Sequence, residues 1–206
     1  TLPPYEQANG TDWYKGTANA IYQNIGFIDS YDPEYVIILS GDQICKQDYA
    51  DFLRFHKEKG AEFSVAVMEV DWKEASRFGL MVADENDRIT EFQEKPPVPK
   101  SNLASMGIYI FNWDVLKKYL EEDEADPNSK NDFGMNIIPA LLRDGRKMYA
   151  YHFNGYWRDV GTIDSLWEAN MEVLDPENSG IDIFDKKWKI YSRNPVLPAQ
   201  KIGPRA

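Results

Sequence analysis

The stretch Tyr35-Val36-Ile37-Ile38-Leu39-Ser40-Gly41-Asp42 decides the fold of this 206-residue chain. Its run of large aliphatic residues is typical of a strand buried on both faces, as in a parallel sheet. Gly41 permits a bend at the carboxyl end of that strand, the edge where open α/β sheets place their ligands. Asp42 is therefore a candidate metal ligand, although a turn or helix-capping role is the simpler explanation from this stretch alone.

The composition excludes several classes of partner. The chain holds 23 basic and 34 acidic residues, a net charge of -11, and no long Lys/Arg run, so we expect neither nucleic acid nor an anionic membrane surface as a partner. The one cysteine, Cys45, permits no internal disulfide, which agrees with a reducing, cytoplasmic compartment. No apolar stretch has membrane-spanning length, and 43% hydrophobic residues are enough for one main domain.

The segments around the central strand alternate between helical and extended patterns. Gly16-Thr17 opens a helical pattern in which Thr17 is a suitable N-cap. After the central strand, a second helix runs to Gly60 and contains His56 as a partly covered residue. Glu62 to Val70 alternates as a strand does, and Phe78 to Val82 with Arg88 to Phe92 predicts a hairpin.

The hairpin leads into Gln93-Glu94-Lys95-Pro96-Pro97. Because the residue before a proline disfavours the helical region, we expect Lys95 to have an extended backbone and a fixed departure point. A solvated lysine on a loop explains the same feature when it is taken alone. Farther along, Glu121 to Asn131 is interpreted as a solvated acidic loop, and Asp132 to Asp144 as a helix.

A second strand-end acid occurs in Tyr156-Trp157-Arg158-Asp159-Val160-Gly161-Thr162, where Thr162 caps the next helix. Asp159 is therefore the second candidate metal ligand, although it too could be a structural turn acid. Mg²⁺ prefers a few carboxylates together with phosphate oxygens and water, and two aspartates at separate strand ends suit that preference. Phosphoryl or nucleotidyl transfer is the favoured chemistry, and a glycosidase that uses paired carboxylates stays open.

Taken together, the motifs of the chain resemble the glucose-1-phosphate adenylyltransferases of bacterial glycogen synthesis. The motifs that carry the resemblance occur in this order: Trp13-Tyr14-Lys15-Gly16-Thr17-Ala18, Leu39-Ser40-Gly41-Asp42, Phe78-Gly79, Glu91-Phe92-Gln93-Glu94-Lys95-Pro96, Ala104-Ser105-Met106-Gly107-Ile108-Tyr109, Asp132-Phe133-Gly134 and Tyr156-Trp157-Arg158-Asp159-Val160-Gly161-Thr162. The Gly-Asp and Glu-Lys-Pro pieces are shared with sugar nucleotidyltransferases generally. The first and last motifs point to the adenylyl branch.

The resemblance implies an α/β fold, a Rossmann-like nucleotidyltransferase domain with three α/β/α layers and a mixed sheet, truncated at both ends. Residues 1–174 would form the catalytic domain, and residues 175–206 a connector toward a left-handed β-helix domain. It also implies the reaction of ATP with α-D-glucose 1-phosphate to give ADP-glucose and pyrophosphate, with Mg²⁺, in a cytoplasmic homotetramer.

Site residues follow from the matching motifs. Asp42 and Asp159 would hold the metal, and Lys95 would pair with the phosphate of glucose 1-phosphate. Residues that would line the glucose pocket are Gly79, Glu94 and Ser105. Residues that would contact the nucleotide are Tyr14, Gly16, Thr17 and Ala18.

Some positions depart from the family pattern, which has Asp in place of Asn19 and His and Tyr in place of Gln43 and Cys45. The family's glycine-rich phosphate loop has no counterpart in residues 1–206, so we expect little or no activity from this stretch alone. Three alternatives stay open: a uridylyl or thymidylyl transferase, a catalytically silent regulatory subunit, and a module that binds a nucleotide sugar without transferring it.

Overall fold

The computed structural model describes residues 2, 6–7, 10–11 and 13–191. The chain forms two compact units, one of residues 1–42 and 47–154, and one of residues 43–46 and 155–206. Among the described residues, no helix is long and apolar enough to cross a membrane. The predicted boundary between residues 174 and 175 stays a prediction, and residues 192–206 of the predicted connector lie outside the described residues.

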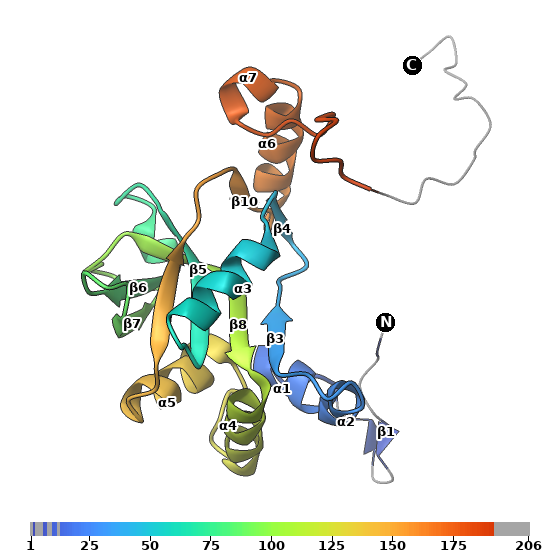
Figure 1. Ribbon diagram of the computed structural model, residues 1–206, viewed down its shortest axis with the longest axis vertical. Coiled ribbons are helices and arrows are strands. Elements are labelled where there is room, and N and C mark those ends of the chain that lie inside the picture. The colour runs from blue at the N-terminus through green and yellow to red at the C-terminus, as the bar shows by residue number, and fades with distance from the viewer. Residues whose placement is uncertain (1, 3–5, 8–9, 12, 192–206) are drawn as a thin grey trace, which may run out of the picture. The chain divides into compact units, whose positions relative to one another are not determined.

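The first unit is built on a six-stranded mixed sheet (Figure 1). Its strands are β3 (Tyr35–Ile38), β5 (Phe63–Glu69), β6 (Gly79–Ala83), β7 (Ile89–Glu94), β8 (Leu103–Asn112) and β9 (Met148–His152). The order is β7-β6-β8-β5-β9, with β3 also paired to β8. Only the β5–β9 pair is parallel among these described strands; the others are antiparallel, which confirms the predicted mixed sheet.

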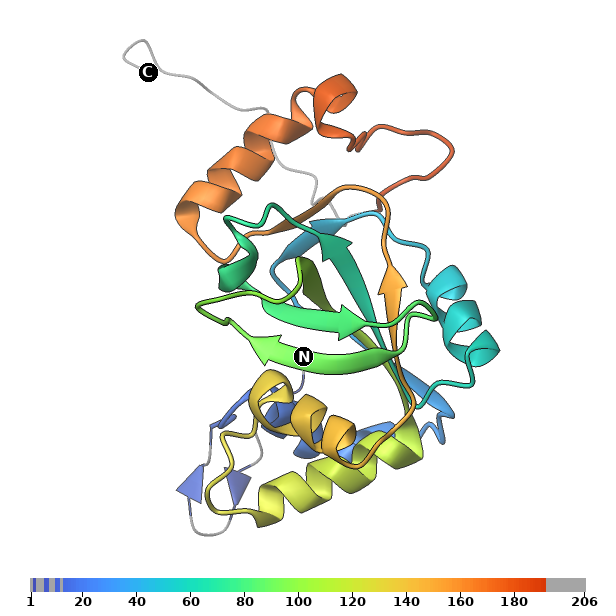
Figure 2. The same cartoon turned by 90° about the vertical axis from the view of Figure 1, so that its left-hand side faces the viewer.

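Helices lie on both faces of this sheet (Figures 1 and 2). In the first unit they are α1 (Thr17–Tyr22), α2 (Ile25–Asp29), α3 (Tyr49–Glu58), η1 (Ala75–Arg77), α4 (Trp113–Ala125), the π-helical turn η2 (Phe133–Ile137) and α5 (Ile138–Arg143). The side chains of β5 show which helices cover which face, because successive side chains of a strand point to opposite faces. Phe63, Val65 and Val67 belong to the core that α4 and α5 cover, whereas Ser64 meets His56 of α3.

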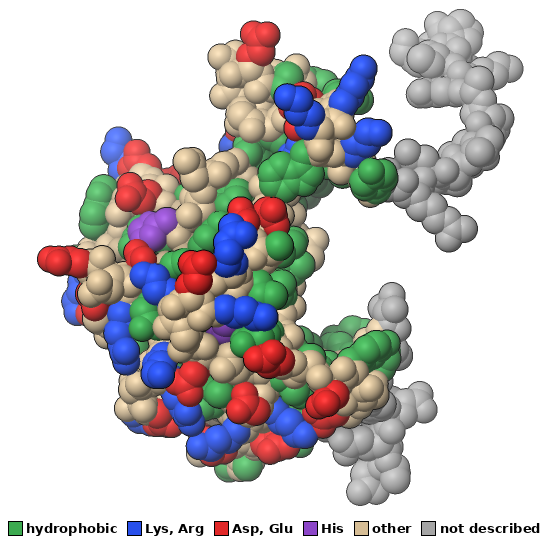
Figure 3. Space-filling model, in the orientation of Figure 1, with side chains coloured by type: hydrophobic (Ala, Val, Ile, Leu, Met, Phe, Trp, Pro, Cys, Tyr) green, Lys and Arg blue, Asp and Glu red, His purple; other side chains and the backbone are tan. Residues whose placement is uncertain are grey.

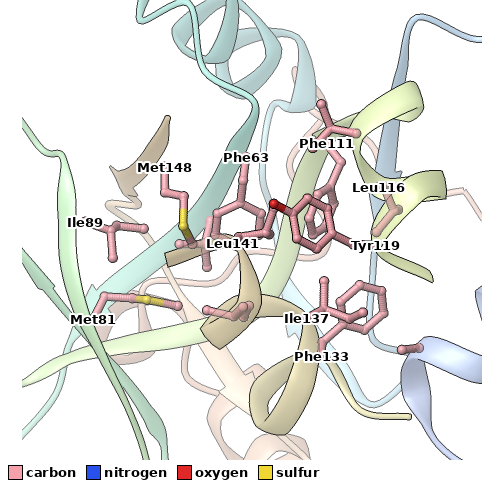
Figure 4. Packing of buried hydrophobic residues seen from close by; sticks show 14 of the residues in the cluster. Phe63, Met81, Ile89, Phe111, Leu116, Tyr119, Phe133, Ile137, Leu141 and Met148 are labelled. Carbon is pink, nitrogen blue, oxygen red and sulfur yellow. The ribbon is translucent and has the colours of Figure 1, made fainter. Parts of the chain in front are cut away.

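Aromatic rings fill the core between the sheet and helices α4 and α5 (Figure 4). The ring centroids of Phe63 and Phe111 lie 4.7 Å apart, and those of Phe111 and Phe133 lie 5.9 Å apart. Because Phe133 opens η2, this packing ties the start of that helix to the central strands β5 and β8. The same core contains Phe63, Val65 and Val67, which confirms the predicted alternation of residues 62–70.

The central strand differs from its prediction. The side chain of Ile37 is 39% exposed and that of Leu39 is 50% exposed, so the expected burial of this run on both faces is wrong. Val36 and Ile38 pack against the core, whereas Ile37 points to the opposite face of β3, which is not fully covered. An apolar pattern shows which side chains a strand can bury, but it does not show which helices or strands pack against them.

Two predicted helices also differ. Thr17 is not the N-cap of α1, because Gly16 holds that position without a side-chain cap. Helix α4 continues to Ala125, so the predicted solvated loop of residues 121–131 begins within a helix, and two of its acids, Asp123 and Glu124, accept hydrogen bonds from Asn131. Sequence alone could not show this, because acidic residues with good helix propensity suit both a loop and an exposed helix end.

The second unit holds a short antiparallel pair, β4 (Gln43–Cys45) with β10 (Trp157–Asp159), followed by α6 (Ile163–Val173) and α7 (Pro176–Ser179). Thr162 caps α6 as predicted and forms a capping box with Ser165. Near the start of the chain, the two-residue strand β1 (Glu6–Gln7) pairs antiparallel with the two-residue strand β2 (Gly10–Thr11).

His56 of α3 is fully buried, not partly covered as expected. Its Nδ1 lies 2.8 Å from Ser64 Oγ, and its Nε2 lies 2.9 Å from Asn112 Oδ1. Because the amide oxygen can only accept, Nε2 carries the proton and Nδ1 accepts from the Ser64 hydroxyl. The neutral imidazole therefore joins α3, β5 and β8.

This burial predicts a stability that depends on pH. Burial lowers the pKa of His56 below its ordinary value near 6.5, so protonation favours the unfolded chain. We expect the free energy of unfolding of the full-length protein to fall as the pH drops through about 6.5, and His56→Gln to reduce that fall.

The measurement is the urea midpoint by tryptophan fluorescence at pH 7.5 and 5.5. His152→Gln is the control, because it removes a histidine whose side chain is 51% exposed. Equal losses in the wild-type protein and in His56→Gln would contradict the assignment.

Candidate functional site

A carboxylate lies between two glycines at the end of the hairpin. Glu94, the last residue of β7, pairs with Gly79, the first residue of β6. A Cβ atom at Gly79 would lie 3.1 Å from Glu94 Oε2, and one at Gly134 would lie 2.6 Å from the same oxygen. Side chains at these two positions would therefore push the Glu94 carboxylate away. Of the two, Gly79 was predicted as a pocket residue and Gly134 was not.

A second carboxylate and a phenol adjoin Glu94. Partial burial and the negative charge of Asp132 raise the pKa of Glu94, and the neighbouring Lys95 opposes this. Burial, together with the charges of Asp132 and Glu94, raises the pKa of Tyr109 to about 12, against a hydrogen bond with Ser105 that lowers it. Ser105 Oγ also accepts the backbone N–H of Gly107 at 3.2 Å. At neutral pH the phenol is protonated, so the cluster offers carboxylate acceptors beside hydroxyl donors.

The turn before α1 lies against the loop before η2. A Cβ atom at Gly16 would lie 2.4 Å from the carbonyl oxygen of Asn131 and 2.7 Å from that of Lys130, so only glycine fits. The N–H of Ala18 donates to that Asn131 oxygen at 2.8 Å. The backbone donor of Ala18, a predicted nucleotide contact, is therefore engaged within the chain.

Thr17 joins this turn to the carboxylate cluster. Its Oγ1 donates to Asp132 Oδ2 at 3.0 Å and accepts the N–H of Phe133 at 3.1 Å. The other oxygen, Asp132 Oδ1, accepts the N–H groups of Gly134 and Met135 and so caps η2. Two predicted sets, the nucleotide turn and the glucose pocket, thus meet through Asp132.

Tyr14, the fourth predicted nucleotide contact, is held by its hydroxyl group. The hydroxyl donates to the carbonyl oxygen of Leu2 at 2.9 Å and accepts from Asn24 Nδ2 at 3.1 Å. These bonds tie the phenol hydroxyl to Asn24, the N-cap residue of α2.

Lys95 has a left-handed backbone with φ +42, so the expected extended conformation is wrong. Its N–H donates to the carbonyl oxygen of Phe78 at 3.2 Å, which continues the β6–β7 ladder by one rung and turns the chain there. A residue other than glycine in this region costs conformational energy, and such residues gather at functional sites. The Lys95 side chain is 66% exposed, and its Nζ lies 3.9 Å from Glu94 Oε1.

The two predicted metal ligands belong to different units. Asp42 Oδ1 accepts a short hydrogen bond from the Ser40 hydroxyl in the first unit. In the second unit, Asp159 pairs with Gln43, the residue that directly follows Asp42 in the chain. No group of three or more His, Cys, Asp or Glu residues suited to a metal occurs among the described residues. Two carboxylates that share a cation with substrate oxygens fit the preference of Mg²⁺, and the Mg²⁺ site stays a prediction.

Sequence reasoning missed Asp132, Tyr109, Asn131 and Gly134 as site residues. A recognisable pattern was present in Asp132-Phe133-Gly134, where an acid precedes a glycine at a helix start, and this motif was given no role. No sequence pattern marked Tyr109 as a site residue, because it lies within an apolar run that is typical of a buried strand.

The sequence profile of the nucleotidyl transferase family matches residues 3–176. The chain belongs to the nucleotidyl transferase family. It is 65% identical over its whole length to a glucose-1-phosphate adenylyltransferase of Clostridium beijerinckii, covering 53% of that protein. It is 57% identical over its whole length to one of Geobacillus stearothermophilus, again covering 53%. The chain therefore spans about half the length of the curated relatives it matches.

The charged side chains of this nucleotidyl transferase chain are mixed in sign on the face shown in Figure 3, where Lys and Arg lie among Asp and Glu. Several charged side chains of the described residues are paired, as in Lys59 with Asp87 at 2.9 Å and Lys117 with Asp29 at 2.6 Å. An anionic ligand of this family member would therefore be met by individual cations and not by a broad basic surface on that face.

The close approach of Gly16 to two carbonyl oxygens predicts that a side chain at this position destabilises the protein. Gly16→Ala is expected to destabilise the protein by about 1–3 kcal/mol, because neither backbone oxygen can move without separating the turn from its loop. Gly26→Ala is the matched control, since a Cβ there meets nothing within 4 Å and alanine favours helix α2 by about 0.5–1 kcal/mol. Thermal unfolding of the full-length variants measures both. A Gly16→Ala midpoint equal to that of the wild-type protein would show that the contact is not tight.

Proposed function

We propose that the protein containing this chain transfers an adenylyl group from ATP to α-D-glucose 1-phosphate, giving ADP-glucose and pyrophosphate. The observation that carries the proposal is the junction of the Gly16-Thr17 turn with the Glu94 and Asp132 carboxylates. The residues that we propose as the nucleotide contact and those that we propose as the sugar pocket thus adjoin the same side chain, Asp132. The relatives that are 65% and 57% identical to this chain are glucose-1-phosphate adenylyltransferases, which supports adenylyl transfer to glucose 1-phosphate within the family.

Each part of the site has a chemical task in this reaction. The phosphate oxygen of glucose 1-phosphate attacks the α-phosphorus of ATP while the bond from that phosphorus to the β,γ-diphosphate breaks, and pyrophosphate leaves. The attacking oxygen is already ionised, so no general base is needed. Lys95 would pair with the sugar phosphate, and Glu94 with Ser105 would accept and donate hydrogen bonds to the glucose hydroxyls beside Gly79.

Asp42 and Asp159 would hold Mg²⁺, which when bound would offset the repulsion between the two anionic substrates. The Gly16–Ala18 turn and Tyr14 would lie along the nucleotide. The homotetramer and the cytoplasmic location stay predictions of the family resemblance.

The test is pyrophosphate release by the full-length protein with Mg²⁺ and glucose 1-phosphate, using ATP, UTP or dTTP in turn. Preference for ATP supports the proposal, and preference for UTP or dTTP would identify the rival transferases. Binding of ADP-glucose in a calorimetric titration without any turnover would instead identify a binding module or a silent regulatory subunit.

Lys95 gives a sharper prediction for the substrate side. Lys95→Gln is expected to raise the KM for glucose 1-phosphate roughly 10–100-fold, because a hydrogen bond to a charged group contributes about 1.5–3 kcal/mol. The KM for ATP should change much less. Lys100→Gln is the matched control, since Lys100 lies on the same loop and is paired with Glu91 at 2.7 Å. Equal KM values for glucose 1-phosphate in the two variants would remove Lys95 from the site.

A further inference from the structure

The second unit contains a guanidinium group that is held by two carboxylates. Arg158, in β10, donates from Nε to Glu172 Oε2 at 3.1 Å and from Nη2, through a short hydrogen bond, to Glu172 Oε1. Its Nη1 donates to Glu168 Oε2 at 2.9 Å. Both carboxylates lie on α6, so this side chain joins the strand to the helix. A guanidinium has only donors, and two parallel bonds to one carboxylate fix its orientation.

Tyr156 holds the same carboxylate of Glu172. Its hydroxyl donates to Glu172 Oε2 at 2.5 Å. Burial, together with this hydrogen bond, raises the pKa of Tyr156 to about 12, so the hydroxyl keeps its proton at neutral pH. Glu172 therefore accepts bonds from two side chains, Tyr156 and Arg158, which we call the clamp together with Glu172.

Apolar packing contributes little to the position of α6. Ala169 is the only buried residue of this helix in the described part of the chain, whereas Ile163 is 85% exposed and Trp167 is 64% exposed. A helix in a folded protein ordinarily owes its place to an apolar face packed on its neighbours. With so little of α6 buried, its polar bonds to β10 decide how it lies on that strand.

Asp159 lies between the two elements that the clamp joins. It is the last residue of β10, and Thr162 caps α6 three positions later. A Cβ atom at Gly161 would lie 3.6 Å from Asp159 Oδ2, so the carboxylate lies beside the start of the helix. A rotation of α6 relative to β10 would therefore be taken up by the backbone that carries this carboxylate.

We propose that Arg158 and Glu172 are positioning residues, whose ion pair sets α6 against β10 and thereby fixes the carboxylate of Asp159, the proposed Mg²⁺ ligand. The inference rests on the proposed function and deepens it, because it excludes Arg158 as a phosphate ligand. In a chain of net charge -11, an arginine next to a metal ligand is otherwise the obvious cation for a substrate phosphate. Here its Nε, Nη1 and Nη2 already donate to carboxylates.

Glu172→Gln breaks the ion pair whichever way the new amide is turned. Arg158 presents two donors, whereas a glutamine offers one oxygen and one NH₂ group, so one of the two parallel bonds is lost. Arg158→Met removes the donors and keeps an unbranched side chain. Glu168→Gln is the matched control, because it removes the same charge from the same helix while its amide oxygen can still accept from Arg158 Nη1.

The experiment measures Mn²⁺ binding to the full-length protein by electron paramagnetic resonance in the presence of ADP-glucose. Glu172→Gln and Arg158→Met should each raise the Kd for Mn²⁺ about tenfold, the lower end of what residues that orient a metal ligand contribute. The double variant should bind Mn²⁺ no more weakly than the weaker single variant, since both changes break one contact. Glu168→Gln should keep the wild-type Kd.

Steady-state kinetics on the same samples test the rival role of Arg158. If Arg158 bound a phosphate, Arg158→Met would raise the KM for glucose 1-phosphate or ATP at saturating Mg²⁺, and Glu172→Gln would not. That result would overturn the inference. The inference instead expects the two variants to share one profile, with a higher Mg²⁺ requirement and KM values for both substrates near those of the wild-type protein.

Thermal midpoints separate positioning from a general loss of stability. Lower midpoints with a wild-type Kd for Mn²⁺ would overturn the inference, as would losses of affinity that add up in the double variant or a Glu168→Gln variant as weak as Glu172→Gln. Each of these results leaves the proposed function intact if the wild-type protein turns over. A wild-type protein that releases no pyrophosphate from ATP and glucose 1-phosphate would overturn the proposed function, and this inference with it.

Discussion

The candidate site depends on one backbone contact, in which the N-terminus of α1 packs against the carbonyl oxygen of Asn131. The N–H of Ala18 donates to this oxygen, and Gly16 passes beside it with no room for a side chain. The contact joins residues that are more than 100 positions apart, and the bond from Thr17 to Asp132, across 115 positions, continues it. The position of the Gly16–Ala18 turn relative to Asp132 therefore depends on these non-covalent contacts.

The sequence predicted those elements whose pattern is local. The alternation of residues 62–70, the hairpin of residues 78–92 and the Thr162 cap each follow from neighbours a few positions apart, and the structure contains all three. Resemblance to a family supplied Glu94 and Gly79, and the structure pairs them directly.

The rest of the site could not be predicted, because its causes are not local. The N–H of Lys95 continues the β6–β7 ladder to Phe78, and Lys95 is left-handed there in spite of the ordinary extended preference before proline. Glu124 reads as one acid among several on an exposed helix end, and only the fold brings it to Asn19, 105 positions away. Polar groups that lie far apart in sequence can satisfy one another in many ways, so their pairing has no signature in composition or spacing.

The backbone of Lys95 also places a cation beside a hydrogen-bond acceptor in this acidic chain. In an extended strand, Glu94 and Lys95 would point to opposite faces, because successive side chains alternate. The left-handed turn breaks that alternation, and Lys95 Nζ lies 3.9 Å from Glu94 Oε1. A hydrogen-bond acceptor and a cation therefore stand side by side. A sugar 1-phosphate, which we propose as the ligand, carries hydroxyls and a phosphate on adjoining atoms and needs that juxtaposition. With that ligand, the conformational cost at Lys95 would be the cost of placing two opposite charges against one small molecule.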